Sequence, residues 1–433
     1  MPGSKVIFWF RRDLRFNDNH GLYEALKSGY EVIPVFIFDK NILDELPEDD
    51  KRVDFIYQQI ISLNEQLLKT GRNLHVYYGF PEEIFSGLAE KYNPLSVYTN
   101  HDYEPYATER DNRISGFLKS KGIEFKTFKD QVLFEKDEIL KSDLTPYVVF
   151  TPFSRRWHER KQEKGVPNYN SIQLLDNFSQ EKAPEIPSLE KMGFKKSGQI
   201  FHKPVIDENL IRKYEETRNF PGLDATSRFG HHLRFGTISV REAIKAGEEF
   251  SLVWLNELIW REFFMQILWH YPNVVKSSFR PEYDRIQWRN DESEFENWKN
   301  GLTGYPMVDA GMRELEHTGF MHNRVRMITA SFLSKHLLID WRRGEAWFAE
   351  KLLDYELSSN NGNWQWAAGT GCDAAPYFRI FNPSEQQKKF DKDLRYIRKW
   401  LPEYGTSAYP KPMVEHTFAR NRCLATYTAA LKP

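Results

Sequence analysis

The sequence predicts an α/β plus all-α fold: an N-terminal doubly wound parallel α/β domain, a long connector and a C-terminal helical domain. Three observations support this prediction. Residues 1–135 alternate short β-branched and aromatic runs with amphipathic stretches, residues 136–204 lose that rhythm, and residues 205–433 follow a helical pattern almost throughout. A chain of 433 residues is also longer than a single hydrophobic core usually serves, which favours two domains.

Four runs in the N-terminal region are typical of buried strands: KVIFWF at 5–10, EVIPVFIFD at 31–39, LHVYYG at 74–79 and LSVYTN at 95–100. The stretches between them carry apolar residues at helical spacing and end near Gly or Asn. Strands and helices in strict alternation predict a parallel sheet with right-handed crossovers. The first strand is not followed by GxGxxG, so we expect any ligand site of this domain at the carboxyl ends of its strands, without a dinucleotide fingerprint.

The connector is rich in Lys, Glu, Ser, Pro and Asn, which predicts a long surface segment. Beyond it, the clearest helical segments are SLVWLNELIWREFFMQILWHYP and NRVRMITASFLSKHLLIDW. Almost no strand pattern remains in this part of the sequence, and we therefore expect a helical domain over residues 205–433.

Composition narrows the classes of function. No apolar run reaches the roughly 18 residues that a membrane-spanning helix needs, and no secretory signal is visible, so we expect a cytoplasmic protein without a membrane partner. Cys372 and Cys423 are too few and too far apart for a disulfide framework or a cysteine metal site, and no metal is expected. The formal net charge is only -1, so any nucleic-acid binding requires a local basic patch.

The segment DATSRFGHHLRFGTIS, residues 224–239, places Thr226, Ser227 and Arg228 ahead of an expected helix. Hydroxyls, backbone N–H groups and a guanidinium at a helix start suit a phosphate or pyrophosphate. An ordinary N-cap explains the same residues, and this stretch alone favours the cap.

In WLNELIWREFF, the residues Glu257, Trp260 and Arg261 share one helix face. An exposed ion pair between Glu257 and Arg261 would stabilise the helix only slightly. Because this helix is apolar nearly all round, a carboxylate and a guanidinium on it are better explained by a polar ligand.

Two later stretches hold further candidates. The run TGFMHNRVRMITASFL places Asn323, Arg324, Arg326 and Met327 near a helix start, where a methionine is usually core filler. The long, polar, Gly-rich stretch DYELSSNNGNWQWAAGTGCDAAPYFRIFNP contains Asn360, whose amide could bond turn backbone or the edge of a flat heterocycle. The turn is the commoner use.

These segments together resemble the photolyase/cryptochrome family, and specifically its class I cyclobutane pyrimidine dimer photolyases. The likeness runs nearly the full chain, is densest from 224 to 383, and rests on motifs that follow one another in the family's order. They are WFRRDLRFNDNHGL, TSRFGHHLRFGTIS, WLNELIWREFF, GLTGYPMVDAGMREL, TGFMHNRVRMITASFLSKHLLIDWRRGE and NNGNWQWAAGTGCDAAPYFRIFNP. The resemblance implies an antenna-type α/β domain over 1–135, a connecting segment over 136–204, and a helical FAD-binding catalytic domain over 205–433.

The resemblance also implies a set of cofactor contacts. Near the flavin, Arg326 with Asp354 would form an ion pair over the isoalloxazine and Asn360 would face N5, where an amide can adapt to both protonation states. The residues expected at FAD, from its phosphates to its ring, are Tyr214, Thr226, Ser227, Arg228, Trp254, Glu257, Arg261, Asn323, Arg326, Asp354, Glu356 and Asn360.

The activity that the resemblance implies is light-driven repair of cyclobutane pyrimidine dimers in DNA, by electron transfer from photoexcited reduced FAD to a flipped-out dimer. Glu257 would be the acid or hydrogen-bond partner of the dimer carbonyl, by the same logic as an oxyanion hole. Trp260 and Trp366 would flank the dimer by stacking, and Met327 would pack against it.

The same resemblance implies DNA contacts and an electron relay. Arg324 and Arg379 would bind the phosphates beside the lesion, which position it without reading sequence. The relay would run from Trp364 through Trp341 to Trp288, although these tryptophans could equally be packing residues. Damaged DNA is the expected partner, and we expect a monomer with no obligate protein partner.

The chain departs from the family pattern at several positions. Glu356 stands where a shorter Asp is common, and Phe320 where some relatives have Trp. Phe229, Gly230 and His231 stand where many relatives have Leu-Ser-Pro, so one hydroxyl contact to the phosphates is in doubt. Thr108 and Glu109 align poorly with the Asn-Glu pair of folate-binding relatives. A second, antenna chromophore is expected, and folate, deazaflavin and a second flavin all remain open.

Four other functions fit the sequence less well. A (6-4) photolyase would carry an active-site His pair where this chain has Met327, and a DASH-type cryptochrome lacks the NNGNWQW form. A photosensory cryptochrome often carries a long tail, whereas this chain stops at Pro433. A generic flavin electron-transfer protein leaves Arg379 and Trp366 unexplained.

Overall fold

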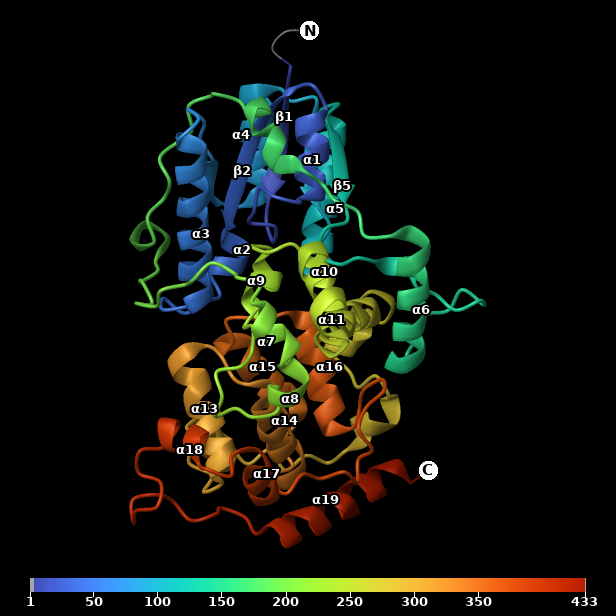
Figure 1. The fold of residues 1–433 in the computed structure, drawn as a ribbon, viewed down its shortest axis with the longest axis vertical. Coiled ribbons are helices and arrows are strands. Elements are labelled where there is room, and N and C mark those ends of the chain that lie inside the picture. The colour runs from blue at the N-terminus through green and yellow to red at the C-terminus, as the bar shows by residue number, and fades with distance from the viewer. Residues whose placement is uncertain (1–3, 433) are drawn as a thin grey trace. The chain divides into compact units, whose positions relative to one another are not determined.

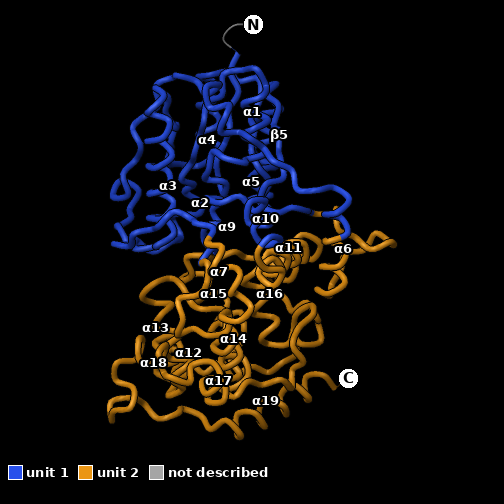
Figure 2. The backbone as a smooth tube through the Cα atoms, viewed as in Figure 1, with its two compact units in different colours: residues 1–135, 159–206, 228–249 blue, residues 136–158, 207–227, 250–433 orange. Residues whose placement is uncertain are grey.

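A computed structural model gives the structure of residues 4–432, which form two compact units (Figure 2). Of the described residues, the first unit contains 4–135, 159–206 and 228–249, and the second contains 136–158, 207–227 and 250–432. The units are therefore interleaved along the chain. They differ from the three consecutive segments, 1–135, 136–204 and 205–433, that the sequence pattern suggested.

The first unit is built on a parallel five-stranded sheet with the strand order β3-β2-β1-β4-β5 (Figure 1). β1 lies in the middle, with Ile7 opposite Ile33 of β2 on one side and opposite Val97 of β4 on the other. The predicted doubly wound α/β fold is confirmed. The strands are β1 (Lys5–Phe10), β2 (Glu31–Asp39), β3 (His75–Gly79), β4 (Ser96–Asn100) and β5 (Glu124–Phe128).

Helices cover both faces of this sheet. Side chains of α4 and α5 pack on the face that carries Ile7 and Trp9, whereas Gly21 of α1 lies against Phe8 on the other face. Caps fix several helix starts: the Asn19 side chain accepts from the Leu22 N–H at the start of α1. The helices of the N-terminal region are α1 (His20–Lys27), α2 (Lys40–Leu43), α3 (Lys51–Leu68), α4 (Pro81–Tyr92) and α5 (Pro105–Ser120).

The segment 228–249 joins the first unit through buried charges. Arg241 of α10 pairs with Asp18 at 2.8 Å and with Asp130 at 2.7 Å, and Arg15 also pairs with Asp130 at 2.7 Å. Gly236 has φ +64°, and a Cβ there would lie 2.2 Å from a backbone oxygen of the segment after β1, so only glycine fits. The segment contains α9 (Gly230–Phe235) and α10 (Val240–Phe250).

Residues 136–204 were predicted to form a long surface segment. Part of this connector is helical, because residues 150–164 form α6 (Phe150–Lys164). The helix is highly charged, so its apolar period is weak in the sequence. Its Trp157 is fully buried and donates its indole N–H to Glu262 at 2.6 Å. The rest of the connector holds short 3-10 turns at Lys136–Glu138, Ser171–Asn177 and Glu190–Met192.

The second unit is helical, as predicted. Its longest helix, α11, starts at Ser251, whose hydroxyl accepts from the Trp254 N–H. The helices are α7 (Glu208–Arg212), α8 (Tyr214–Thr217), α11 (Leu252–His270), α12 (Glu292–Lys299), α13 (Pro306–Thr318), α14 (Asn323–Ser331), α15 (Trp341–Lys351), α16 (Leu357–Ala368), α17 (Pro383–Phe390), α18 (Arg395–Trp400) and α19 (His416–Leu431), with 3-10 turns at Pro272–Val275 and Pro281–Arg285 and a π-helical turn, η6 (Phe332–His336).

The Gly-rich segment around Asn360 forms a helix, α16. Gly362 explains the composition, because a Cβ there would lie 2.1 Å from the ring of Phe264 on α11. Glycine is thus needed for the close packing of α11 on α16. Within residues 4–432, we find no helix that is both long and apolar enough to cross a membrane.

Candidate functional site

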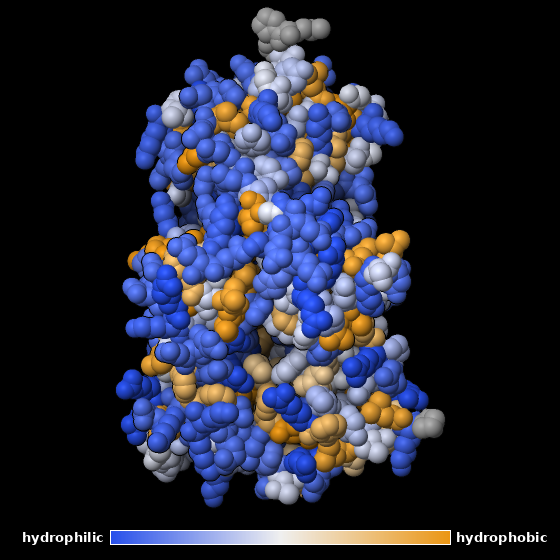
Figure 3. Space-filling model, turned by 45° about the vertical axis from the view of Figure 1, so that its right-hand side comes forward, coloured by the Kyte–Doolittle hydropathy of each residue, from blue (hydrophilic) through white to orange (hydrophobic). Residues whose placement is uncertain are grey.

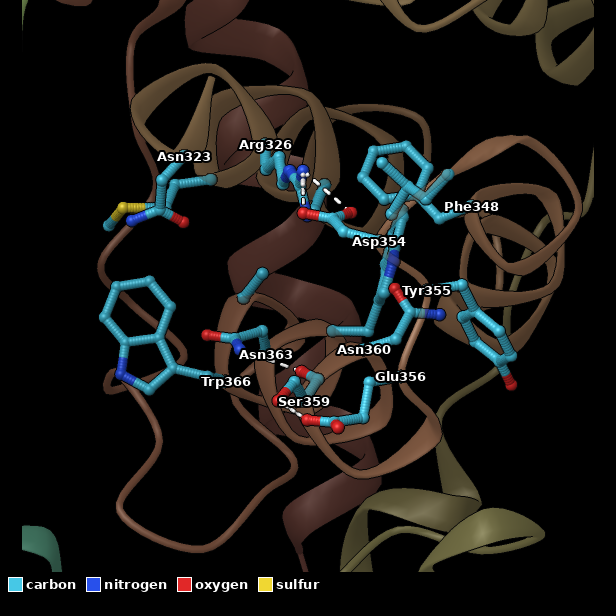
Figure 4. A pocket seen from close by; sticks show the side chains of 15 residues that line it. Asn323, Arg326, Phe348, Asp354, Tyr355, Glu356, Ser359, Asn360, Asn363 and Trp366 are labelled. Atoms are coloured by element: carbon cyan, nitrogen blue, oxygen red, sulfur yellow. Dashed lines mark hydrogen bonds and ion pairs between the residues drawn. The ribbon is translucent and has the colours of Figure 1, made fainter. Parts of the chain in front are cut away.

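The second unit contains a hollow between α14, α16 and the residues that precede α16. Counted with the part that is open to solvent, its volume is about 590 Å³. Figure 3 shows a hollow on the face of this unit that is in view, and Figure 4 shows the lining side chains from close by. The walls combine apolar side chains with a few polar groups, the mixture typical of cofactor sites. They are formed by Asn323, Arg326, Met327, Ala330, Phe348, Leu352, Asp354, Tyr355, Glu356, Ser359, Asn360, Asn363, Trp364, Trp366 and Ala367.

A second hollow, of about 830 Å³, adjoins the first. The two share Asn323, Met327, Ser359, Asn363 and Trp366 in their walls, so they lie directly beside one another. The second hollow is also lined by four side chains of α11, namely Glu257, Trp260, Arg261 and Phe264. Arg218, from outside α11, completes this wall. Most of the candidates from α11, α14 and α16 thus meet around one cavity.

Two ion pairs fix charged side chains in the cavity wall. Arg326 Nη2 lies 2.9 Å from Asp354, as expected, and its Nε donates to the Met321 carbonyl at 2.7 Å (Figure 4). Arg261 Nη2 lies 2.9 Å from Glu356, which is buried. The charge of each guanidinium is therefore neutralised, that of Arg326 beside the first hollow and that of Arg261 beside the adjoining one.

Asn360 is held in one orientation by a residue that sequence reasoning missed. Its Nδ2 donates to Glu345 Oε1 at 2.8 Å and to the Glu345 carbonyl at 3.0 Å. Because both partners are acceptors, the amide nitrogen must face them and Oδ1 must point away. Among the described residues, Oδ1 has no hydrogen-bond donor, so it is available to a ligand in the first hollow. Burial raises the pKa of the Glu345 carboxyl, and the hydrogen bond from Asn360 opposes that shift.

Glu257 also has a partner that the sequence did not indicate. Its Oε1 lies 2.6 Å from Arg218 Nη1, rather than pairing with Arg261 on its own helix. Burial raises the pKa of the Glu257 carboxyl above its usual value, while Arg218 opposes the shift. The Arg218 guanidinium in turn lies 5.1 Å from the ring of Tyr214.

Trp260 is fixed by aromatic neighbours. Phe150, the first residue of α6, stacks on it with 3.6 Å between ring centroids and 4° between planes, and Phe264 lies at 5.6 Å. The Phe150 N–H donates to Asp373 at 3.0 Å. Trp260 still borders the second hollow together with Trp366, so that hollow has an indole from each of two helices in its walls.

Two family models match the chain. One described as the FAD-binding domain of DNA photolyase matches residues 254–408, and one described as DNA photolyase matches residues 6–170. A deoxyribodipyrimidine photo-lyase of Synechococcus sp. is 36% identical over 98% of this chain and 96% of its own length.

The chain belongs to the DNA photolyase family.

Solved members of this family have the same fold. A bacterial class III photolyase from Agrobacterium tumefaciens matches with a TM-score of 0.87 and 33% identity over 100% of this chain and 99% of that one. An archaeal photolyase from Sulfolobus tokodaii, solved with two FAD molecules, matches with a TM-score of 0.83 and 34% identity over 98% of this chain and 100% of that one. The assignment to class I remains a prediction, since one of these neighbours is a class III enzyme.

Residues 254–408 are thus an FAD-binding domain, and the cavity fits the flavin of such a domain. The apolar walls suit a flat ring, and the free Oδ1 of Asn360 suits its polar edge. Several photolyase-motif residues do not border either hollow. Tyr214 reaches the cavity only through Arg218, Trp254 is buried in α11, and Thr226 and Ser227 lie in the loop before α9.

Arg228 also lies outside both hollows and belongs to the first unit, with φ +52°. The roles of Tyr214, Trp254 and the loop residues Thr226 to Arg228 at a cofactor therefore remain predictions from the motif.

A group of arginines gives the second unit a local positive charge. Arg218, Arg324 and Arg379 are close enough to interact: burial lowers the pKa of the Arg324 guanidinium, and Arg218 and Arg379 lower it further. Arg324 Nη2 donates to Asn219 at 2.5 Å, while its buried Nε has no partner among the described residues. Arg379 is exposed. Such a cluster, with few carboxylates, favours an anion.

The three relay candidates lie in or against one hydrophobic cluster. Trp364 and Trp341 are buried members, and Trp364 also borders the first hollow. Trp288 is half-buried and packs against the cluster. Gly344 of α15 lies against Trp364, because a Cβ there would be 2.2 Å from that indole. As Trp341 precedes Gly344 by three residues on α15, it shares the helix face that meets Trp364.

Proposed function

We propose that the chain repairs cyclobutane pyrimidine dimers in DNA, with the dimer flipped out of the duplex into the second hollow. One observation carries this proposal. A hollow bordered by two indoles and a carboxylate shares five wall residues with a hollow suited to a flavin, so a base and the cofactor would lie next to one another. The photolyase relatives support light-driven DNA repair in general, and the substrate is our inference.

The first hollow would hold the flavin. Reduced FAD, when bound, supplies the photoexcited electron that splits the dimer and that afterwards returns. Asn360 presents Oδ1 as an acceptor there, and Glu345 keeps the amide from rotating. The Arg326–Asp354 pair places a fixed dipole in the wall without adding net charge. Because these groups are already held in place, they need not reorient when charge moves, and the reaction pays no reorganisation energy for them.

The second hollow would hold the dimer. Trp260 and Trp366 offer flat apolar surfaces, and Met327 provides an adaptable contact between the two hollows. Phe150 keeps Trp260 in place from one face. A dimer is poorly stacked in its duplex, so it costs less to extrude than an intact base pair, and this difference contributes to selectivity.

Glu257 would bond the dimer carbonyl. Burial favours the protonated carboxyl, which can donate a hydrogen bond, and Arg218 favours the carboxylate. If an entering dimer displaced Arg218 from Glu257, the lowering of the Glu257 pKa by Arg218 would be lost. The carboxyl would then donate where negative charge develops on the substrate.

Outside the hollow, Arg324 and Arg379 would bind phosphates on either side of the flipped dimer. Phosphate contacts fix the register of a protein on DNA without reading its sequence. A second chromophore for light harvesting is part of the proposal, with folate, deazaflavin or flavin as its class. We propose that the chain acts as a monomer.

The test is a repair assay on two lesions. The purified chain, loaded with FAD and reduced, is exposed to blue light with duplex oligonucleotides that carry one cyclobutane thymine dimer or one (6-4) photoproduct. We expect restoration of the first lesion only, measured by chromatography. Repair of the (6-4) lesion instead would replace the proposed substrate, and repair of neither would leave a photosensory function as the better account.

Replacing Glu257 with Ala should lower the quantum yield of dimer repair severalfold, because the negative charge that develops on the dimer carbonyl would lose a hydrogen-bond donor. Glu257→Gln keeps an N–H donor and should retain more of the yield than Ala. The yield is measured per photon absorbed at saturating DNA. An undiminished yield in Glu257→Ala would exclude the proposed carbonyl contact.

A further inference from the structure

The π-helical turn η6 directly continues the helix that carries Asn323, Arg326 and Met327. Its hallmark is the hydrogen bond from the Leu337 N–H to the Phe332 carbonyl, 3.1 Å, five residues back. Every residue of η6 is buried. Such turns widen a helix locally and are frequent at functional sites. The buried side chains of this turn are therefore candidates for a functional role.

Lys335 in this turn is the side chain that lacks a purely structural explanation. It is 1% exposed, and its Nζ donates to the Arg379 carbonyl at 2.9 Å. Within residues 4–432, no carboxylate pairs with it. Burial is the main reason that the pKa of Lys335 falls to about 8; Arg379 contributes to the lowering and Cys423 opposes it. A buried ammonium with a neutral acceptor destabilises a fold relative to an apolar side chain of similar size.

The acceptor belongs to the segment between α16 and α17, which carries the exposed Arg379 side chain. Within it, the Arg379 N–H donates to the Pro376 carbonyl at 2.8 Å. Tyr377 stacks on Tyr427 of α19, with 5.7 Å between ring centroids and 13° between planes. Near Arg379 the segment is attached to the helical core by this ring stack, by Ile380, which packs against the cluster around Cys423 and Tyr427, and by the Lys335 hydrogen bond. Of these contacts, the hydrogen bond acts at the residue that carries the guanidinium.

We propose that Lys335 is a positioning residue for lesion binding: it holds the Arg379 backbone so that the guanidinium is already placed for a DNA phosphate. The inference rests on the proposed function. A preplaced guanidinium loses less conformational entropy on binding than a free one.

The experiment is a double-mutant cycle with Lys335→Met and Arg379→Ala in the FAD-loaded chain. Met keeps the apolar stem but removes the donor and the charge, so the fold and the flavin spectrum should be retained. We expect each single variant to raise the Kd for a duplex with one thymine dimer about tenfold. The double variant should bind no more weakly than Arg379→Ala alone, because Lys335 acts through Arg379.

Two further readouts separate positioning from a general structural effect. Repair per absorbed photon at saturating DNA should change far less than the Kd. Trypsin should cut after Arg379 faster in Lys335→Met than in the wild type, because the segment loses its attachment. Lys351→Met is the matched control: its ammonium pairs with Glu316 at 3.2 Å, and neither the Kd nor that cleavage should change.

Additive effects in the cycle, or an unchanged Kd and unchanged cleavage in Lys335→Met, would overturn the inference. An unchanged Kd in Arg379→Ala would instead overturn the phosphate contact in the proposed function. The two failures are therefore distinguishable from the single variants alone.

Discussion

Replacing Trp341 with Phe is expected to abolish light-driven reduction of oxidised flavin, while repair by chemically prereduced enzyme continues. Trp364 borders the flavin hollow, Trp341 lies on the helix face that meets it, and Trp288 packs on the same cluster from a half-buried position. Phenylalanine preserves the apolar packing but is much harder to oxidise than an indole. Photoreduction is followed by the loss of flavin absorbance under blue light with a reductant.

The surroundings of these indoles favour electron transfer over proton loss. The Nε1 groups of Trp341 and Trp364 are buried and have no acceptor among the described residues. An electron that leaves either ring would therefore not be followed by local proton transfer, and the positive charge could move outward to Trp288.

Trp298→Phe is the matched control, because Trp298 lies 6.1 Å from Trp364 in the same cluster. Its other ring neighbours are Phe295 and Phe348, which are poor electron donors. We expect its photoreduction to persist. If Trp298→Phe were inactive and Trp341→Phe active, the relay would run through Trp298. Equal loss of photoreduction and repair in Trp341→Phe would mean that the variant damages the flavin site itself.

The strands of the first unit were predictable because each is a continuous apolar run between turn residues. β5, EFKTF, was missed because it is half-exposed and alternates charged residues with aromatic ones. The attachment of residues 228–249 to the first unit was also missed. That attachment depends on Arg241 meeting Asp18 and Asp130, contacts of more than 100 residues in separation that leave no local pattern.

At the site too, the sequence identified some residues and missed others. The helical spacing of Glu257 and Arg261 placed both on one face, and both do border the second hollow. Their partners, Arg218 and Glu356, come from other segments, so spacing could not identify them. Glu345 gave no signal at all: its function depends on the orientation of an amide 15 residues away. Family motifs identify the residues at a site, but they do not predict the hydrogen bonds and ion pairs that fix the side chains in place.

Lowering the pH is expected to destabilise the fold through His336 on η6. Burial, together with the nearby His416, Arg422 and Lys335, lowers the pKa of His336 from 6.5 to about 3. Between these two values the unfolded chain binds a proton that the folded chain does not, so stability falls as the pH falls below 6.5. We expect His336 alone to remove about 1.4 kcal/mol of unfolding free energy between about pH 7.5 and pH 5.5.

Urea unfolding of the wild type and of His336→Gln at both pH values measures this contribution. The variant loses the titrating ring, so its unfolding free energy should fall less between the two pH values. His317→Gln, at an exposed position, is the control and should follow the wild type. An equal pH dependence in His336→Gln and the wild type would show that a proton reaches the folded imidazole, for instance by rearrangement of the 2.9 Å contact between His336 and His416. Because η6 also carries Lys335, such a rearrangement would predict weaker attachment of the Arg379 segment in acid.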